Sequence, residues 1–378
     1  MSATRSLLAA AALALLAPIL ASPTSSAAPT SASTVTAGGY AYTVLIAQTA
    51  LRDIGGCSLN DSGQVAMVAR ERATTTAPWR PKVLRLDGAT TTTIMTTRQG
   101  LGPSIEAVIN NLGQVAVRTG SGNSLHAPSV ILEGDGGPVT VVANTGTGQP
   151  LTGQGLGLSI GDNGRVAFVG TTSTSYGIYT ATRPSDLKTR YLNTDIASSF
   201  GYVSSPQLNA SGQIAFNQND ANRVQGVYRV EPGGAVTRLY QAPRASSQIA
   251  SPTSMNRAGR VAFVTAVSPR LPRTLYTTQG GPLTLVASAA DGLAPFSASI
   301  NDGGVVAFRA SRGGGSPGLY VGSTPSFASV VQIGDVIGGG QVSDIWPCDR
   351  MLNNAGQVAF LASLRNGPKI IVRADPLP

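Results

Sequence analysis

The chain has 378 residues, of which 42% are hydrophobic, 5% aromatic and 12% charged, and its formal net charge is +9. It contains 45 glycines, two cysteines and a single histidine, His126. One histidine excludes metal sites built on two or three histidines, and it leaves one candidate base for a Ser/His/Asp or Cys/His mechanism. Two cysteines exclude a zinc ribbon or a disulfide-dense scaffold. The apolar fraction is too high for a disordered chain, and we expect neither a metal nor a cofactor.

The N-terminus has the pattern of a secretory signal peptide. Arg5 precedes an uncharged run at 7–20, and small residues that suit cleavage after Ala21 or Ala27 follow it. The alternative, a membrane anchor, needs about 20 apolar residues. We therefore predict a signal peptide at 1–21, a flexible Ser/Thr/Pro/Ala-rich segment at 22–38 and an exported domain at 39–378. We expect no transmembrane segment in the mature chain.

Seven similar units follow one another along the exported domain. Each unit has a glycine followed by any residue, then Val or Ile, then Ala, and the last five units add Phe. The residue three before the glycine is Asn in six units and Gly161 in the third. Successive glycines lie 50, 51, 48, 47, 45 and 52 residues apart, and a period near 50 is typical of a repeat architecture. The seven glycines are Gly63, Gly113, Gly164, Gly212, Gly259, Gly304 and Gly356.

The Asn-x-x-Gly segment predicts a tight hairpin turn. The Asn side chain can bond the backbone two residues on, and glycine accepts the positive φ of a G1 bulge. In the strand that follows, the Val/Ile and Phe positions share one face and Ala points to the other. A small residue at this place in all seven units predicts a close approach by the neighbouring sheet. We interpret the asparagines as turn formers rather than as ligand contacts.

Each unit holds two further strands, such as those at 177–179 and 283–286. Four strands in about 50 residues are the content of one propeller blade. The seventh unit ends after its third strand, at Val372, and a matching strand stands at the other end of the chain, at 42–46. We predict an all-β fold, a seven-bladed β-propeller of four-stranded antiparallel blades. The N-terminal strand is expected to complete the last blade and close the ring, which removes the exposed sheet edges.

The repeated Asn-x-x-Gly-x-Val-Ala-Phe resembles the repeat of the bacterial NxxGxxAF tandem-repeat proteins, over essentially all of residues 40–374. The resemblance implies an exported bacterial protein with no assigned activity. Proteins of that family carry varying C-terminal surface anchors, whereas this sequence ends without a recognisable one. The segment 299–303 also resembles the Asp-box of sialidase-like propellers, although its Asp is displaced.

The two cysteines stand in the units that ring closure would make neighbours. Cys57 lies three residues before Asn60 in the first unit, and Cys348 lies five before Asn353 in the seventh. We predict a disulfide between them, which an exported protein permits. A bridge across nearly the whole chain would stabilise the fold by about 4–5 kcal/mol through the entropy of the unfolded state. Two buried free thiols are the alternative.

Candidate catalytic residues are few. Glu106 and Asp349 each lie four residues before the Asn of their unit, and Arg350 follows Asp349. If the first strand of each unit is innermost, these residues line the mouth of a central channel, where paired carboxylates could act on a glycan. Units two and seven are not adjacent, however, so solvated side chains are the alternative. His126 lies in a Gly/Ser/Asn-rich loop, where we expect an exposed side chain.

The loops opposite the tight turns vary in length and composition, and such loops on a rigid scaffold commonly bind ligands. We place a ligand-binding face there, with Arg52, Asp53, Arg98 and Trp346 as its candidates. Other charged or aromatic residues assigned to these loops are Trp79, Arg80, Asp195, Arg244, Asp291, Asp335 and Asp344.

The composition and the repeats together predict an exported, monomeric binding or surface-interaction module, in the extracellular space or the periplasm. Its ligand could be a glycan, an anionic polymer or a protein, because the net charge is positive. No basic cluster with interleaved aromatics is present to predict specific nucleic-acid binding. Two alternatives remain: a hydrolase or lyase that acts on a polysaccharide at the channel mouth, and a scaffold of the envelope or matrix.

Overall fold

The computed structural model describes residues 36–378, apart from 38, 48–50, 72–79, 103, 121–128, 194–202, 221, 223, 244–247, 250–252 and 267–271. The predicted signal peptide, most of the segment 22–38 and His126 lie outside the described residues. The described residues are all-β, with three single-turn 3-10 helices: η1 (Thr97–Gln99), η2 (Pro184–Asp186) and η3 (Ala289–Asp291). None of the described helices is long and apolar enough to cross a bilayer.

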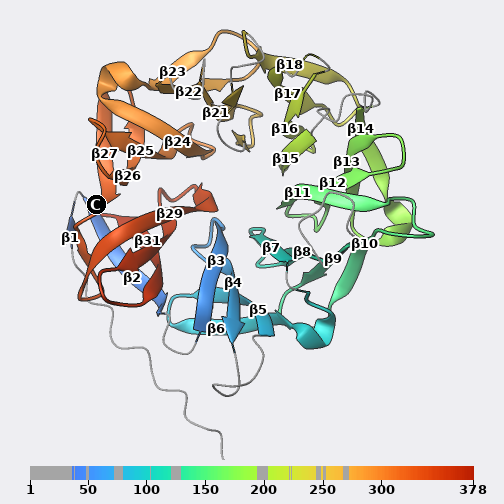
Figure 1. The fold of residues 1–378 in the computed structure, drawn as a ribbon, viewed down its shortest axis with the longest axis horizontal. Helices are drawn as coiled ribbons and strands as arrows, with labels where there is room; N and C mark the ends of the chain where they lie inside the picture. The colour runs from blue at the N-terminus through green and yellow to red at the C-terminus, as the bar shows by residue number, and fades with distance from the viewer. Residues whose placement is uncertain are drawn as a thin grey trace, which may run out of the picture. The chain divides into compact units, whose positions relative to one another are not determined.

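The strands of the described residues form six sheets around a common centre (Figure 1). Five sheets each contain one unit, and all their neighbouring strands are antiparallel. The second unit forms β7 (Ser104–Ile109), β8 (Val115–Gly120), β9 (Ser129–Gly134) and β10 (Thr140–Asn144). The third forms β11 (Gly153–Ile160), β12 (Val166–Thr171), β13 (Tyr176–Ala181) and β14 (Lys188–Asn193). The fourth forms β15 (Val203–Leu208), β16 (Ile214–Asn219), β17 (Gln225–Val230) and β18 (Val236–Gln241).

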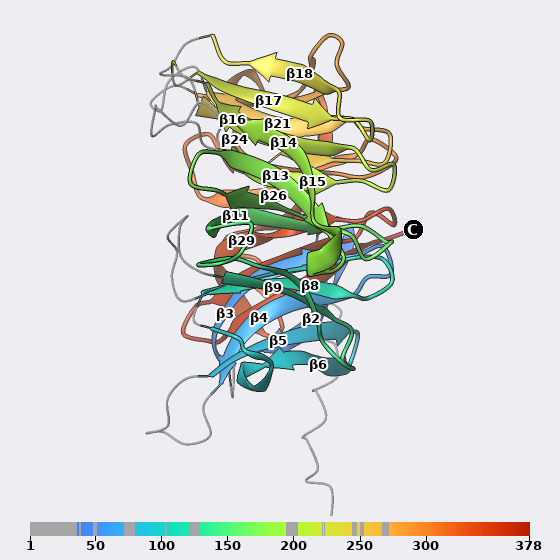
Figure 2. The ribbon, with the colours of Figure 1, turned by 90° about the vertical axis from the view of Figure 1, so that its right-hand side faces the viewer.

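The fifth and sixth units follow the same order. The fifth forms β19 (Gln248–Ile249), β20 (Ser254–Met255), β21 (Val261–Ala266), β22 (Arg273–Thr278) and β23 (Thr284–Ala287). Here β19 and β20 both pair with β21, so the first strand is interrupted. The sixth forms β24 (Leu293–Ile300), β25 (Val306–Arg312), β26 (Pro317–Ser323) and β27 (Ser326–Gln332). Figure 2 shows the sheets from the side, with the third unit, β11–β14, on the side that faces the viewer.

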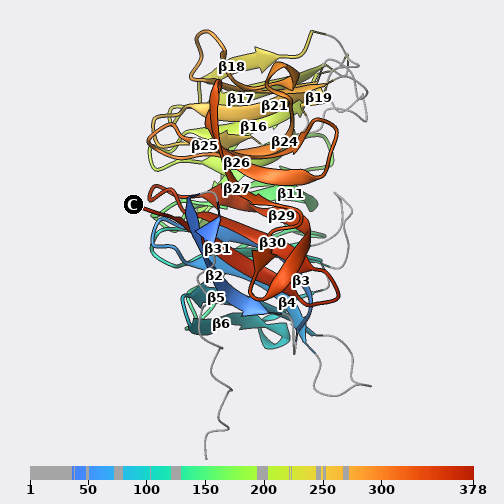
Figure 3. The ribbon, with the colours of Figure 1, turned by 90° about the vertical axis from the view of Figure 1, so that its left-hand side faces the viewer.

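The remaining sheet has ten strands and joins the two ends of the repeat. Its N-terminal strands are β1 (Thr36–Ala37), β2 (Tyr40–Ala47), β3 (Leu51–Leu59), β4 (Val65–Glu71), β5 (Arg80–Asp87) and β6 (Thr90–Thr96). Its C-terminal strands are β28 (Val336–Ile337), β29 (Gly340–Leu352), β30 (Val358–Leu364) and β31 (Lys369–Pro376). The predicted pairing of the N-terminal strand with the C-terminal strand is present, because β2 runs antiparallel to β31 (Figure 3).

The prediction of separate four-stranded sheets needs one correction. A parallel bridge between Arg350 of β29 and Ser58 of β3 merges the run β2-β31-β30-β29 with the run β3-β4-β5-β6. The innermost strand β29 is also unusually long, at 13 residues. These two innermost strands therefore lie close enough to exchange a backbone hydrogen bond.

All seven predicted hairpin turns are present between the first and second strands of the units. In the first, Gly63 N donates to Asn60 O at 3.1 Å, and Asn60 N donates to Gln64 O at 3.0 Å. The same two bonds recur in the other six turns. The turn glycines all have positive φ, between 72° at Gly164 and 80° at Gly113. This backbone is the one a G1 bulge requires, so the turn prediction is confirmed.

The predicted close approach of neighbouring sheets is present in the core. The alanine of each second strand is fully buried, and the five repeated phenylalanines are at most 1% exposed. Ala167 packs in one cluster with Phe216 of the next unit, and Ala262 does so with Phe308. In the first two units, Met67 and Val117 stand where the others have Phe, and Met67 shares a cluster with Ala359 of the seventh unit. Each sheet interface therefore places a large side chain against a small one.

Candidate functional site

The tight turns and the innermost strands surround a cavity of about 190 Å³. Every unit contributes to its lining, through β3, β7, β11, β15, β20, β24 and β29 (Figure 1). The lining is polar rather than apolar, with carboxylates, amides and guanidinium groups. The charged and amide side chains among the lining residues are Asp61, Asn111, Asp162, Gln207, Asn209, Asn256, Arg257, Asn301, Asp302, Asp349, Arg350 and Asn354.

Buried asparagine side chains link each turn to the next around this cavity. Asn60 Nδ2 donates to Asn110 O at 2.9 Å, and Asn353 Nδ2 donates to Asn60 O at 3.0 Å. The same bond to the following turn is made by Asn110, Asn209, Asn256 and Asn301. The turn itself needs only a side-chain oxygen that accepts a hydrogen bond, and Asp could supply that oxygen as well as Asn. Only Asn also has an amide N–H group that can donate to the next turn. The presence of Asn rather than Asp in six units is therefore the sequence signal of the bond between turns. The interpretation of these residues as turn formers alone misses this bond.

The third unit forms the same turn although it has Gly161 in place of the asparagine. Gly161 stands in the Asn position, and Asn163 Oδ1 accepts from Arg165 N at 3.1 Å, as Asn60 Oδ1 does from Gln64 N. The side-chain link to the next turn is absent at Gly161. A bond from Leu208 N to Ser159 Oγ at 3.0 Å joins the third and fourth units instead.

The residues that follow these asparagines form a second row at the mouth of the cavity. Asn354 N and Nδ2 both donate to the carboxylate of Asp61, each at 2.9 Å, and Asn354 Nδ2 also donates to Asp302. Asn111 makes the corresponding pair of bonds to Asp162. These carboxylates are therefore held by amide donors. No group of three or more His, Cys, Asp or Glu side chains that could hold a metal ion occurs among the described residues.

Asp349 enters the cavity from β29 together with Arg350. Solvent reaches the Asp349 side chain, yet protein atoms surround its carboxyl group closely. Burial in the first place, and the charge of Glu106 in the second, raise the pKa of Asp349 to about 6. Such a carboxyl group can gain or lose a proton near neutral pH.

Glu106 acts on Asp349 although their units are not neighbours, because innermost strands from all units converge on one centre. Its carboxylate on β7 accepts from Arg118 Nε at 3.3 Å and from Gly157 N at 3.2 Å. Glu106 is not part of the cavity lining, whereas Asp349 and Arg350 are. Of the three sequence-predicted candidates, two therefore line the cavity and the third does not.

Two guanidinium groups line the cavity, from Arg257 and Arg350. Neither forms an ion pair with a carboxylate of the described residues. Four carboxylates share the lining, so the cavity offers charges of both signs at short range. An arrangement of this kind can donate to and accept from the hydroxyl groups of a polar ligand.

The residues predicted for a ligand-binding face lie elsewhere. Arg98 is exposed in η1, and Trp346 is 38% exposed in β29 with Lys369 Nζ 5.5 Å from its ring centroid. Neither lines the cavity. Arg52 and Asp53 belong to β3, so they and Trp346 lie in innermost strands and their assignment to loops is wrong. The strands run further than the sequence pattern predicts because Arg52 pairs with Arg70 of β4, and Trp346 pairs with Leu361 of β30.

The other residues assigned to these loops are spread over several elements. Asp344 also lies in β29, where it contacts Arg309 Nη2 at 3.8 Å. Arg80 begins β5, Asp291 ends η3, and Asp335 follows β27. Trp79, Asp195 and Arg244 lie outside the described residues.

The predicted disulfide is present. Cys57 of β3 and Cys348 of β29 are bonded, with 4.6 Å between their Cα atoms and 291 residues between them in sequence. No free cysteine remains. The bridge lies where the first and last units meet, next to the backbone bridge of Arg350 and Ser58.

Comparison with known proteins identifies similar folds but assigns no activity. Residues 193–370 match the sequence profile of a family of unknown function, DUF7453. This match does not confirm the NxxGxxAF family. No curated protein matches the sequence. Among solved structures, the chain is similar to the β-propeller domain of the trilobed protease from Pyrococcus furiosus, with a TM-score of 0.57 and 11% identity over 87% of this chain and 94% of that one.

Two further similar structures are polysaccharide-degrading enzymes. The polysaccharide lyase Uly1 has a TM-score of 0.52 and 9% identity, over 87% of this chain and 90% of that one. The GH74 xyloglucanase from Xanthomonas campestris has a TM-score of 0.53 and 11% identity, and the match spans 87% of this chain but only 53% of the xyloglucanase. At these identities the likeness concerns the fold alone. The chain is thus an all-β protein with propeller-like structural neighbours, and its residues 193–370 resemble DUF7453.

Proposed function

We propose that the chain is an exported seven-bladed β-propeller that binds one end of an extracellular glycan in its central cavity. The observation that carries this proposal is the cavity itself. Side chains from all seven units line it, and they combine carboxylates, amides and two guanidinium groups without a described ion-pair partner. Groups of this kind match sugar hydroxyls, which both donate and accept hydrogen bonds. At about 190 Å³ the cavity suits a small ligand or the end of a longer one.

Seven blades are supported by how the ten-stranded sheet divides. Its runs β2-β31-β30-β29 and β3-β4-β5-β6 each have the strand order of one unit, which adds two blades to the five separate sheets. Closure is supported by the bond from Asn353 to Asn60, by the β2–β31 pairing and by the disulfide. A closed ring leaves only the short outer strands of the blades as sheet edges, so we propose a monomer.

Export is supported by two features. The pattern of Arg5 followed by the apolar run 7–20 is that of a signal peptide. The disulfide between Cys57 and Cys348 would persist in the periplasm or outside the cell, where the environment is oxidising. We place the mature domain at 39–378, as the sequence predicts.

A glycan array, followed by calorimetry on the glycans retained, tests the binding proposal. Asp349→Asn and Arg350→Gln each remove one charge from the cavity, and we expect each to weaken binding by about tenfold or more, as for a lost charge-assisted hydrogen bond. Arg98→Gln removes an exposed charge outside the cavity and serves as the matched control. Failure of the array to retain the protein, or wild-type affinity in both cavity variants, would contradict the proposal.

One observation favours a second function, a polysaccharide hydrolase or lyase that works at the same cavity. Asp349, with a pKa of about 6, stands beside a guanidinium group and within the electrostatic reach of Glu106. A carboxyl group poised in this way suits general acid–base chemistry. Incubation with neutral and uronate-containing polysaccharides, read by new reducing ends and by ultraviolet absorbance of unsaturated products, tests it. Turnover that disappears in Asp349→Asn would support the enzyme, and retained glycans without turnover would support binding alone.

A further inference from the structure

A second polar hollow lies away from the central cavity, between the third and fourth units. It is a groove of about 350 Å³, formed by Arg165 just before β12, by strands β13 and β14 and by the turn at 232–234. Figure 2 shows the two sheets on either side of it, β11–β14 and β15–β18. Arg165, Lys188 and Arg190 line the groove, and no carboxylate does. Such a concentration of positive charge is unusual in a chain of which only 12% is charged.

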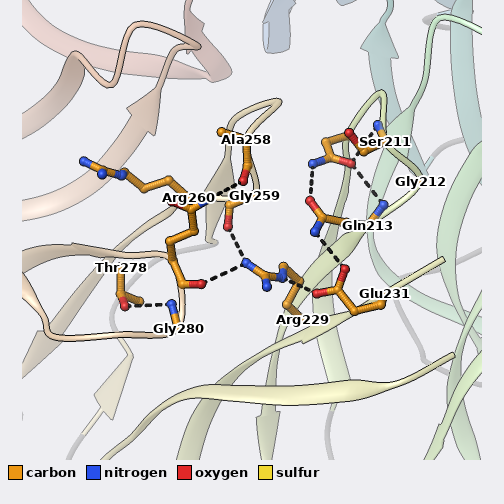
Figure 4. Close-up of polar contacts among 12 residues, drawn as sticks. Ser211, Gly212, Gln213, Arg229, Glu231, Ala258, Gly259, Arg260, Thr278 and Gly280 are labelled. Carbon is orange, nitrogen blue, oxygen red and sulfur yellow. Dashed lines mark hydrogen bonds and ion pairs between the residues drawn. The ribbon is translucent and has the colours of Figure 1, made fainter. Parts of the chain in front are cut away.

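Arg165 replaces a neutral residue that other units use at the same place. The residue after the turn glycine is Gln64, Gln114, Gln213 or Gln357 in four units. Gln213 Nε2 donates to Glu231 at 2.8 Å, and this bond connects the second strand to the end of the third (Figure 4). Arg165 Nη2 makes the corresponding contact to Asp186 at 3.1 Å. Its other terminal nitrogen, Nη1, is buried and has no hydrogen-bond partner among the described residues.

Arg190 brings a second guanidinium group to the same place. Its Nη2 donates to Gly212 O, Glu231 O and Pro232 O, at 3.3, 3.0 and 3.4 Å. In other units, an arginine of the third strand donates a hydrogen bond to the next turn. Arg229 Nη1, for example, donates to Gly259 O at 2.9 Å (Figure 4). Burial, and then the positive charge of Arg165, lower the pKa of Arg190. The two guanidinium groups are thus close enough to repel each other.

The carboxylates next to the groove are already occupied: Glu231 binds Arg229 and Gln213, and Asp186 binds Arg165. Burial alone would raise the pKa of Asp186, but bonds from Thr182 N, Arg183 N and the Thr182 hydroxyl, with the charge of Arg165, lower it to about 2. Asp186 therefore balances one of the three cations. Lys188 is exposed and forms no ion pair with a carboxylate of the described residues. Two positive charges are left for an outside partner.

We propose that this groove binds a tetrahedral oxyanion, the sulfate or phosphate group of an exogenous ligand. Guanidinium forks match the paired oxygens of such groups, and an anion between Arg165 and Arg190 would relieve their repulsion. The open side of the groove leaves space for a sugar or another organic group that carries the anion. The site is independent of the central cavity and shares no lining residue with it.

The test titrates the full mature chain with inorganic sulfate, inorganic phosphate, glucose 6-sulfate and glucose 6-phosphate at constant ionic strength. Calorimetry measures affinity, and amide NMR shifts locate the site, with the amides of Thr189 and Gly233 expected to move. Arg165→Gln restores the residue that four other units use, so it removes the charge while keeping a partner for Asp186. Lys188→Gln is a second variant at an exposed position. Arg260→Gln is the matched control, because Arg260 holds the same place in the fifth unit.

We expect saturable binding at millimolar or lower anion, weakened about tenfold or more by Arg165→Gln and by Lys188→Gln and unchanged by Arg260→Gln. Binding of only the sulfated or only the phosphorylated sugar would support the site and identify the source of the anion. Absence of saturation by all four probes would overturn the proposal. Equal binding by wild type and both groove variants would overturn it as well.

Discussion

The asparagine that opens each tight turn carries two structural tasks in one side chain. Its Oδ1 accepts a hydrogen bond from its own turn, as Asn353 Oδ1 does from Gln357 N at 2.9 Å. Its Nδ2 donates to the next turn, as Asn353 Nδ2 does to Asn60 O. The amide is buried in all six units that have it, and a buried amide without partners is costly. The residue therefore stabilises the local hairpin and the contact between units together.

Asn110→Ala tests this double role. The substitution removes the bonds to Gly161 O at 3.0 Å and to Gln114 N at 2.9 Å. We expect the free energy of unfolding to fall by about 1–3 kcal/mol, since buried partners are left unsatisfied. Chemical denaturation measures the loss. Asn144→Ala, at an exposed strand end, is the control, and an equal effect of both changes would show that the link between turns contributes nothing.

The carboxyl group of Asp349 predicts a pH dependence of stability. Its pKa is about 6 in the folded protein against an ordinary 3.8, so the folded state binds a proton more tightly than the unfolded state. Stability therefore falls as pH rises from about 4 to about 6, because the folded chain must give up that proton. Asp349→Asn cannot ionise and should escape this loss.

Denaturation midpoints of the wild type and Asp349→Asn at a series of pH values check this prediction. We expect the variant to gain on the wild type through the window from about 4 to about 6 and to stay ahead above it. Measurements below that window serve as the internal control for any packing effect of the amide. A constant difference between the two proteins at every pH would rule out the raised pKa.

At the scale of the sheets, stability comes from repeated pairs of one large and one small side chain. Ala215 of the fourth unit packs in one cluster with Phe263 of the fifth, and Ala116 with Phe168 does the same two units earlier. The aromatic rings gain further contacts within their own sheets, as Phe216 does with Tyr228 at 5.6 Å between ring centroids. The alanine sets the distance between the sheets, because any larger side chain would push the ring away.

Ala215→Leu should therefore destabilise by overpacking, although the change adds apolar surface. We expect a loss of about 1–3 kcal/mol in the free energy of unfolding, measured by denaturant titration. Ala210→Leu, in the exposed turn of the same unit, is the matched control and should have little effect. An unchanged or increased stability of Ala215→Leu would refute the close approach at this interface.

At the scale of the whole molecule, the first and last units are joined in several ways. The strand β2 pairs with β31, and Arg373 Nη1 of the last unit donates to Gly63 O of the first at 2.9 Å. The Tyr42 hydroxyl of β2 donates to Val330 O of the sixth unit at 2.5 Å. The disulfide adds a covalent link across 291 residues. A long loop closed by a bridge restricts the unfolded chain strongly.

Replacing both cysteines by serine, as Cys57→Ser with Cys348→Ser, should lower the free energy of unfolding by up to about 5 kcal/mol. The comparison of denaturation curves with those of the oxidised wild type measures this. Intact mass after alkylation provides the control, since the wild type should gain labels only once it has been reduced. Labelling of both cysteines without reduction would contradict the bridge.

The sequence by itself determined the hairpin turns, the buried faces of the strands, the partner of the N-terminal strand and the disulfide. These features depend on local turn chemistry and on a repeat that brings equivalent positions together, so a linear pattern is enough to predict them. Only the tertiary structure decided which side chains meet at the centre. Three features depend on strand length, stagger and the convergence of sheets: the effect of Glu106 on Asp349, the extension of β3 and β29 into presumed loops, and the groove that Arg165 shares with Arg190. None of these is periodic in the sequence, because each arises where one unit departs from the repeat.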